Sequence, residues 1–312
     1  LRYLGEMPLN RYFNEVTREL KEELSSYVGH GVGPDQILMG NGADEMLYYL
    51  FTALRDDATS HIVAPAPSYF DYKSYCDAVG LGISLVDLKD TLEIDADAMV
   101  SALSEPSAKA LILCNPNNPT GNLTSSATIR AVLESTCKLV VIDETYFEFS
   151  KHTSLPLLPK YPHLLIVRSF SKAFGAAGLR FGYALGSPDV IRELVKVKTA
   201  FNLSLLTQAA ALFTLRHRQP FLKAVAALCQ SRDDMARELE AAGTRVLRTE
   251  TNFLPFSIGG KSAALHEYLT RNGVAVRDVG GHRLLRDFLR VTVSSPSDNR
   301  RFLDLVNEFI SV

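Results

Sequence analysis

The sequence predicts an α/β fold, in which a doubly wound, mostly parallel sheet is accompanied by a smaller α+β domain. Three observations lead to this prediction. Short apolar segments rich in β-branched residues alternate with helical patterns over the middle of the chain. Several of these segments are continuous runs of Val, Ile and Leu, which is typical of strands buried on both faces. Long Ala- and Leu-rich helical stretches follow residue 205, outside the alternating region.

Seven apolar segments are the predicted strands of the large sheet. They are Ile37–Met39, His61–Ala64, Ile83–Leu88, Ala110–Cys114, Leu139–Asp143, Leu164–Arg168 and Phe181–Leu185. Helical patterns such as those over residues 44–54 and 125–133 lie between them. Ligands of such sheets bind at the carboxyl ends of the strands, so residues that directly follow a strand are candidates for a site.

The two ends of the chain have different patterns. Val16, Leu20, Leu24 and Tyr27 recur every three or four residues, which indicates an amphipathic helix. After residue 205 we expect helices over 206–215, 221–242 and 262–272, strands over 252–258, 274–277 and 289–293, and a final helix from about residue 298. We therefore expect a large domain over 30–205 and a small domain over 206–312, joined by residues 1–29.

Composition excludes several classes of protein. The 312 residues carry a formal charge of -2 without a basic stripe, so we expect no nucleic acid as a partner. Apolar residues make up 46 %, which is enough for a large core. No signal peptide and no apolar run of ~18 residues is visible, so we expect no membrane partner. Four scattered cysteines without a CxxC pair predict thiols in a reducing compartment, and hence a cytoplasmic protein.

The first chemical motif follows the strand Leu164–Arg168. It contains Ser169, Ser171 and Lys172, and a loop of small residues leads from it to Arg180. The hydroxyls and the guanidinium can bind a phosphate, and the lysine amine can form an imine with an aldehyde. Taken alone, the segment is equally well interpreted as a surface loop that happens to carry a lysine and an arginine.

The second motif is Asp143, which ends the apolar strand Leu139–Asp143. A buried carboxylate is costly without a partner, and the protonated nitrogen of a pyridine cofactor is one such partner. A helix N-cap or a metal ligand are the alternatives. No cluster of His and Cys in the sequence favours the metal.

Two further motifs also follow strands. Cys114–Gly121 is rich in Asn and Pro, and an Asn amide there can donate to a phenolate oxygen, although a plain turn has the same composition. Gly40–Glu45 begins a helix, where free backbone N–H groups can bind an anion. A simple helix cap explains this second segment as well.

These four motifs, in this order, resemble those of the fold-type I pyridoxal-5′-phosphate (PLP) enzymes of the class I/II aminotransferase family. Within that family the resemblance is strongest to the histidinol-phosphate aminotransferases, and it runs from about Leu9 to the C-terminus. The strings Ser169–Tyr183 and Asn115–Gly121 are its most specific parts. The resemblance implies PLP as the cofactor, an amino donor and a 2-oxo acid such as 2-oxoglutarate as substrates, and a homodimer with shared active sites.

The resemblance also implies roles for residues around the cofactor ring. Lys172 matches the lysine that holds PLP as a Schiff base, and Asp143 matches the partner of the pyridine nitrogen. Tyr69 matches the aromatic residue that stacks on the ring, and we count these three as catalytic. Asn118 and Tyr146 match residues that hydrogen-bond the cofactor's O3′ oxygen.

A phosphate-binding set is implied in the same way. Ala43 and Asp44 match residues that contact the phosphate through backbone or side chain, and Ser169, Ser171 and Arg180 complete the set.

Residues for the substrate and for a second subunit follow from the same resemblance. Arg290 matches the arginine that binds the substrate carboxylate, and Arg277 matches a second arginine on the substrate side. Asn118 is counted with them among the substrate-binding residues. A surface charge after a strand is the alternative for Arg277. Tyr12 matches a tyrosine that reaches the phosphate of the neighbouring subunit, whereas the role of Asn202 stays open.

The sequence departs from the family near its start. Family members usually carry an N-terminal arm that closes over the substrate, and no such motif is seen here; it is trimmed, disordered or lost. The chain begins at Leu1 rather than Met, which is consistent with a missing upstream segment. Arg11–Asn14 replaces the usual turn and Thr199–Asn202 lacks the usual Pro-Tyr, so the identity of the substrate stays open.

Other functions on a related scaffold are alternatives. A decarboxylase of the threonine-phosphate type, or another PLP tailoring enzyme, would break a different bond of the substrate. A PLP-binding sensor of a transcription regulator would carry a basic DNA-binding module, and none is seen. A plain nucleotide-binding module is disfavoured because no GxGxxG motif follows the first strand.

Overall fold

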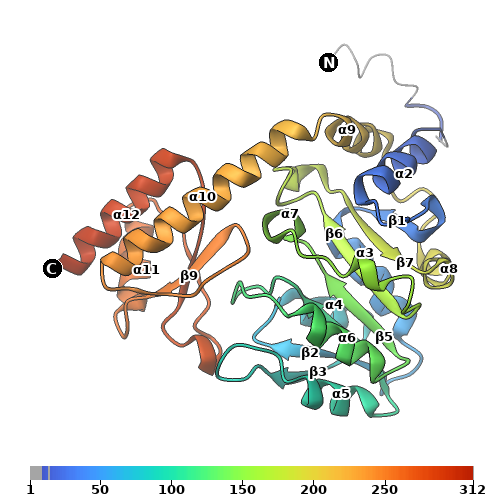
Figure 1. The fold of residues 1–312 in the computed structure, drawn as a ribbon, viewed down its shortest axis with the longest axis horizontal. Coiled ribbons are helices and arrows are strands. Elements are labelled where there is room, and N and C mark those ends of the chain that lie inside the picture. Colours follow the sequence, from blue (N-terminus) through green and yellow to red (C-terminus); the bar gives the residue numbers. More distant parts are fainter. Residues whose placement is uncertain (1–8, 13–14, 312) are drawn as a thin grey trace.

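The computed structural model describes residues 9–12 and 15–311, which form two sheets with helices around them (Figure 1). Two residues of the Arg11–Asn14 turn, Phe13 and Asn14, lie outside the described residues. So does the start of the predicted joining segment. In the part of the chain that is described, no helix combines the length and the apolar character needed to cross a bilayer.

The large sheet has seven strands in the order β1-β7-β6-β5-β4-β2-β3. Their bounds are β1 Ile37–Gly40, β2 His61–Ala66, β3 Gly82–Asp87, β4 Ala108–Cys114, β5 Leu139–Asp143, β6 Leu164–Ser169 and β7 Gly182–Gly186. Strand β7 runs antiparallel to both of its neighbours, and the other described pairs of this sheet are parallel. The predicted doubly wound, mostly parallel sheet is confirmed.

Helices cover both faces of this sheet. One face packs against α2 (Glu15–Val28), α5 (Ala96–Ser104), α6 (Ser126–Glu134) and α9 (Leu205–Arg216). The other packs against α3 (Gly42–Leu54), α4 (Asp71–Val79) and α8 (Pro188–Val197). In β5, Val140 and Ile142 join the first core and Val141 joins the second, and all three are fully buried. The unbroken apolar run of this strand is therefore a consequence of burial on both faces.

The second sheet has four antiparallel strands in the order β10-β11-β9-β8. Its elements are β8 Arg245–Val246, β9 Phe253–Ser257, β10 Arg277–Asp278, β11 Leu289–Thr292, α10 Gln219–Ala241, α11 Ser262–Arg271 and α12 Pro296–Ser311. Helix α10 runs from the large part of the molecule to the small one (Figure 1). Short helical turns complete the described elements: η1 Pro34–Gln36, α7 Phe147–Ser150, η2 Leu155–Leu157, η3 Ala177–Leu179 and η4 Arg283–Leu285.

The predicted strand over 274–277 is wrong in its extent, because pairing begins only at Arg277. Gly273 has a φ of 72°, and the N–H of Val274 donates to the carbonyl of Leu269, so these residues close the end of α11. The predicted division at residue 205 stays a prediction. Leu212 and Leu215 of α9 pack in the core of the large sheet, which favours a boundary further along, within α10.

Candidate active site

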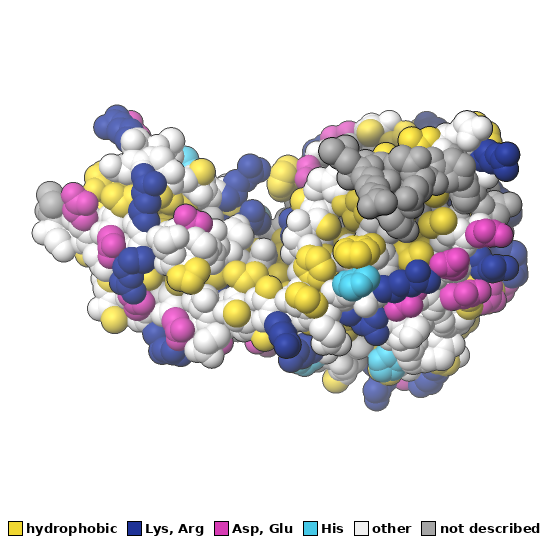
Figure 2. Space-filling model, turned by 90° about the horizontal axis from the view of Figure 1, so that it is seen from above, with side chains coloured by type: hydrophobic (Ala, Val, Ile, Leu, Met, Phe, Trp, Pro, Cys, Tyr) yellow, Lys and Arg dark blue, Asp and Glu magenta, His cyan; other side chains and the backbone are white. Residues whose placement is uncertain are grey.

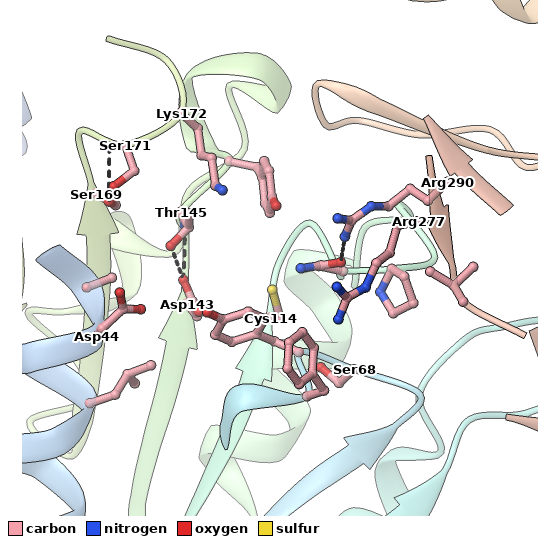
Figure 3. A pocket seen from close by; sticks show the side chains of 18 of the residues that line it. Asp44, Ser68, Cys114, Asp143, Thr145, Ser169, Ser171, Lys172, Arg277 and Arg290 are labelled. Carbon is pink, nitrogen blue, oxygen red and sulfur yellow. Dashed lines mark hydrogen bonds between the residues drawn. The ribbon is translucent and has the colours of Figure 1, made fainter. Parts of the chain in front are cut away.

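A cavity of about 540 Å³ lies between the two sheets. The last residues of β4, β5 and β6 line one wall, and β10 and β11 of the small sheet supply Arg277 and Arg290 to the other (Figure 3). Its position at the carboxyl ends of parallel strands is the one that the fold predicts, and its volume suits a small-molecule ligand.

Lys172 follows β6 in a tight turn, in which the N–H of Gly175 donates to the Lys172 carbonyl at 3.1 Å. Its amine points into the cavity, as Figure 3 shows. Partial burial and the positive charge of Arg290 lower the pKa of Lys172. A larger fraction of this amine is therefore neutral than in a free lysine, and the neutral form is the nucleophilic and basic one.

Asp143 ends β5 and faces the cavity from a buried position. Its Oδ1 atom accepts the backbone N–H of Thr145 at 3.1 Å and the hydroxyl of Thr145 at 2.6 Å. Its Oδ2 atom accepts the hydroxyl of Tyr72 at 2.9 Å. Burial raises the pKa of Asp143. The helix N-cap alternative is wrong, because Tyr146 precedes the next helix and Asp143 instead stabilises the turn at Thr145 while it lines the cavity.

Donors for an anion gather at one end of the cavity. Ser171 donates its N–H to the Ser169 hydroxyl at 3.1 Å, and the two hydroxyls lie 3.0 Å apart. Arg180 lies beside them and forms an ion pair with Asp44 at 2.6 Å. Ala43 and Asp44 line the same end at the start of the 13-residue helix α3. Hydroxyls, a guanidinium and a helix N-terminus are the donors that a phosphate needs.

The middle of the cavity suits an aromatic ring. Tyr69 lines it and meets Tyr72 edge-on, with the ring centroids 5.2 Å apart. Asn118 and Tyr146 line it too, and burial raises the pKa of Tyr146, so its hydroxyl stays a donor. With Asp143 at one edge and the phosphate donors at another, the residues present fit PLP.

Two arginines mark the opposite end of the cavity. The Arg277 guanidinium lies 5.1 Å from the Phe70 ring centroid, and that of Arg290 lies 4.8 Å from the Phe253 centroid. Arg290 also donates from Nη1 to the Oδ1 atom of Asn118. Its Nε atom is buried without a partner among the described residues. The cavity therefore has positively charged groups at both ends.

Tyr12 and Asn202 do not join the cavity residues. Tyr12 is 79 % exposed, stacks on Phe201 with centroids 3.9 Å apart, and lines a separate cavity of about 670 Å³. Asn202 lines the same second cavity and donates to the carbonyl of Met39 and to the Glu45 carboxylate. These bonds give Asn202 a structural role, which the sequence had left open.

Three residues of the cavity region were missed by reasoning from the sequence. Thr145 lies two residues after Asp143, and this spacing is the signal of a side chain that caps its own turn. Cys114 was named as a free thiol and as the first residue of the Asn- and Pro-rich motif, but not as a site residue, although it lines the cavity. Tyr72 reaches Asp143 from 71 positions away, so no local pattern could have indicated it.

Comparisons with known proteins agree with this geometry. The family model described as aminotransferase class I and II matches residues 5–306. Histidinol-phosphate aminotransferase 1 of Ralstonia nicotianae is 38 % identical over 309 residues, which cover 96 % of this chain and 81 % of that protein. Histidinol-phosphate aminotransferase of Methanothermobacter thermautotrophicus is 36 % identical over 310 residues, with 97 % and 82 % covered.

A solved structure shares the fold. The histidinol-phosphate aminotransferase of Sinorhizobium meliloti, in complex with pyridoxal-5′-phosphate, superimposes with a TM-score of 0.89 at 24 % identity, covering 99 % of this chain and 85 % of that one. The predicted fold-type I architecture is confirmed.

Proposed function

This chain belongs to the family of class I and II aminotransferases, and on that premise we propose that its amino donor is histidinol phosphate or a closely related amino phosphate. The protein is a PLP-dependent aminotransferase, which moves an amino group to a 2-oxo acid. We propose 2-oxoglutarate as that acid. The names of the relatives at 38 % and 36 % identity support the choice of donor.

One observation carries the proposal. The cavity has anion-binding groups at both ends, and Lys172 points into the space between them (Figure 3). The Ser169 and Ser171 end suits the cofactor phosphate, which leaves Arg277 and Arg290 for the anionic group of a substrate. Histidinol phosphate and 2-oxoglutarate both carry such a group, so one site can serve both halves of the reaction.

When bound, pyridoxal phosphate supplies an aldehyde that can bond to an amine and a ring that withdraws electrons from the substrate Cα. Lys172 Nζ provides the amine in the resting enzyme. With a substrate amine in its place at the cofactor, the lowered pKa of Lys172 would favour the neutral amine, so that Nζ would serve as the base for the Cα proton and hold it for return. Asp143 would hold the cofactor by accepting the N–H of its ring nitrogen, which would keep that nitrogen protonated.

Arg290 orients the substrate. A guanidinium binds a carboxylate or a phosphate through two parallel hydrogen bonds, and this fixes which bond of Cα faces Lys172. Arg277 adds a second positive charge at the same end of the cavity. Asn118 accepts a hydrogen bond from Arg290 and lines the cavity, and we assign it a contact with the substrate and one with the cofactor's O3′ oxygen.

A half-reaction experiment tests the proposal. Holoenzyme would receive histidinol phosphate, L-glutamate and O-phospho-L-threonine one at a time, while the visible absorption of the bound cofactor is recorded. We expect a change to the pyridoxamine form with histidinol phosphate and with glutamate, and its reversal by 2-oxoglutarate. Carbon dioxide release without consumption of a 2-oxo acid would instead identify the decarboxylase alternative.

We also propose a homodimer in which Tyr12 of each subunit reaches the partner's cofactor phosphate. Its support is an apolar surface on the face that carries α9, where hydrophobic side chains gather in Figure 2. Leu9, Tyr12, Phe201 and Phe213 are all more than half exposed there. Such a surface is typical of a contact between subunits.

Mixing two inactive variants tests this shared site. In a heterodimer of Lys172→Ala and Tyr12→Ala subunits, one of the two sites would contain both native residues. We expect about a quarter of all sites in the mixture to be native when the two variants are present in equal amounts. This holds if subunits pair at random around a two-fold axis, because half of the dimers are then heterodimers. No recovery from a mixture that sediments as a dimer would contradict the proposal.

We propose the cytoplasm as the location of the enzyme. The support is that the four cysteines are all free thiols in the described structure, with Cys76 and Cys114 buried. Free thiols persist in reducing compartments.

A further inference from the structure

Tyr72 is a buried residue of α4 that contacts two residues of the cavity wall, Asp143 and Tyr69. Its side chain is 1 % exposed, and its hydroxyl donates to Asp143 Oδ2 at 2.9 Å. A hydrogen bond to a carboxylate is stronger than one between neutral groups. Burial and the nearby charge of Asp143 raise the pKa of Tyr72 far above its usual value, so the hydroxyl keeps its proton and remains a donor.

The bond from Tyr72 determines how many acceptor directions of the Asp143 carboxylate stay free. A carboxylate has about four lone-pair directions, two on each oxygen. Thr145 supplies two donors to Oδ1, which fills that atom. Tyr72 supplies one donor to Oδ2, which leaves a single free acceptor direction on the oxygen that Tyr72 holds.

We propose that Tyr72 is a positioning residue that holds Asp143 Oδ2 in place to accept the N–H of the cofactor's ring nitrogen. The inference rests on the role proposed above for Asp143. Tyr72 acts through Asp143 and makes no contact with the reacting atoms. Its edge-on contact with Tyr69 also connects this carboxylate to the ring predicted to stack on the cofactor.

The chemical consequence follows from the burial of the pair. Without the Tyr72 hydroxyl, Oδ2 would be a carboxylate oxygen in a site of low polarity with one donor fewer, so the neutral acid would be favoured further. A neutral Asp143 accepts poorly from a ring N–H. Loss of the Tyr72 hydroxyl should therefore weaken the binding of a ligand that has the ring nitrogen and leave the binding of one that lacks it unchanged.

Binding of two cofactor forms to apoenzyme tests the inference without measuring activity. The forms are pyridoxal phosphate and its 1-carba analogue, in which a C–H replaces the ring nitrogen. Dissociation constants would be measured by equilibrium dialysis for wild type and Tyr72→Phe. We expect the variant to bind pyridoxal phosphate about 10-fold more weakly and the analogue with less than about 2-fold change, as for the loss of one hydrogen bond to a charged group.

Tyr161→Phe is the matched control. It also removes a tyrosine hydroxyl bonded to a carboxylate, because Tyr161 donates to Glu134 at 2.7 Å. That pair lies before the start of β6, whereas Lys172 follows its end. We expect this variant to bind both cofactor forms like wild type, and the melting temperature of each apoenzyme would verify its folding.

Asp143→Asn separates the two levels of the proposal. If wild type and Asp143→Asn discriminate equally between the cofactor forms, the role of Asp143 fails, and this inference fails with it. The role of Tyr72 alone is overturned if Asp143→Asn loses the preference for pyridoxal phosphate over the analogue while Tyr72→Phe keeps it. It is also overturned if Tyr72→Phe weakens the binding of both cofactor forms equally. In the double variant, Tyr72→Phe should cause no further loss of discrimination, and an additional loss would also overturn it.

Discussion

The two walls of the cavity differ in how their polar groups are satisfied. On the large-sheet wall, Asp143 and Ser169 already have hydrogen-bond partners from their own wall. On the small-sheet wall, Arg290 has a buried Nε without a partner in the described structure, and Arg277 lies over the exposed ring of Phe70. A preorganised wall suits a ligand that stays bound, whereas free donors suit ligands that are exchanged.

The largest effect is expected at the boundary between these walls. Lys172→Ala removes both the amine for the cofactor and the proton carrier, so we expect amino transfer to fall at least about 10⁴-fold. Steady-state assays on cofactor-loaded protein measure this. Turnover at the wild-type rate would show that the cavity is not the reaction site.

Behind the large-sheet wall, a buried ion pair is expected to have the next largest effect. Glu144 accepts two hydrogen bonds from Arg168, at 3.0 and 2.8 Å, and both side chains are at most 2 % exposed. Glu144→Ala would leave the Arg168 charge buried without the carboxylate to which it is hydrogen-bonded. We therefore expect the free energy of unfolding in urea to fall by about 3–5 kcal/mol.

The control for that variant is an ion pair at the surface. Lys73 and Asp77 form a pair whose side chains are both more than 60 % exposed. Asp77→Asn should change the free energy of unfolding by less than about 1 kcal/mol. Equal losses for the two variants would mean that the wall does not depend on its buried pair.

On the small-sheet wall we expect an effect on the reaction with the substrate and none on cofactor binding. Arg290→Ala should lower kcat/KM for the 2-oxo acid about 10- to 100-fold, which is the loss of a charged hydrogen-bonded contact. Cofactor affinity should stay unchanged. The control is Arg283→Ala, because Arg283 pairs with Asp87 and Asp90 outside the cavity. If Arg290→Ala lowered cofactor affinity as much as kcat/KM, the two walls would not differ in the ligand that they bind.

A pH effect of smaller size is expected at Glu148, which also lies behind the large-sheet wall and accepts the hydroxyl of Tyr27. Burial raises the pKa of Glu148 from 4.5 to about 6. Between these values the folded protein binds more protons than the unfolded chain, so stability falls as pH rises and the loss is complete above about pH 6.

Glu148→Gln does not titrate and serves as the reference. The free energy of unfolding of wild type relative to this variant should decrease by about 2 kcal/mol between pH 4 and pH 7, at ~1.4 kcal/mol per unit of pKa. Urea denaturation at several pH values measures it. Parallel pH curves for the two proteins would contradict the burial argument.

The same difference between the walls explains what the sequence could predict. Asp143 and Ser169 end buried strands and Lys172 lies just after one, so strand patterns and the position of sheet ligands were enough to group them. Contacts between distant segments were not predictable in this way. The bond from Arg290 to Asn118 joins residues 172 positions apart, and no periodicity encodes such a pairing.

Among the strands, those that escaped prediction are too short for a pattern. Strand β8 has two residues, Arg245–Val246, and two residues cannot show a period. Strand β10 is equally short, and the apolar residues before it close a helix instead. The long buried strands of the large sheet were predicted well because burial on both faces requires an unbroken apolar run.

The bond between Asn118 and Arg290 has a consequence for the readiness of the guanidinium. A guanidinium carries five N–H donors, and Asn118 accepts only one of those on Nη1. The Nε atom has no partner in the described structure, so an arriving carboxylate can bind without displacing Asn118. Because Asn118 already holds the planar group in one orientation, Arg290 loses less conformational freedom when a ligand binds. An enzyme that binds two different acids in every cycle thus meets each of them with the same oriented donor.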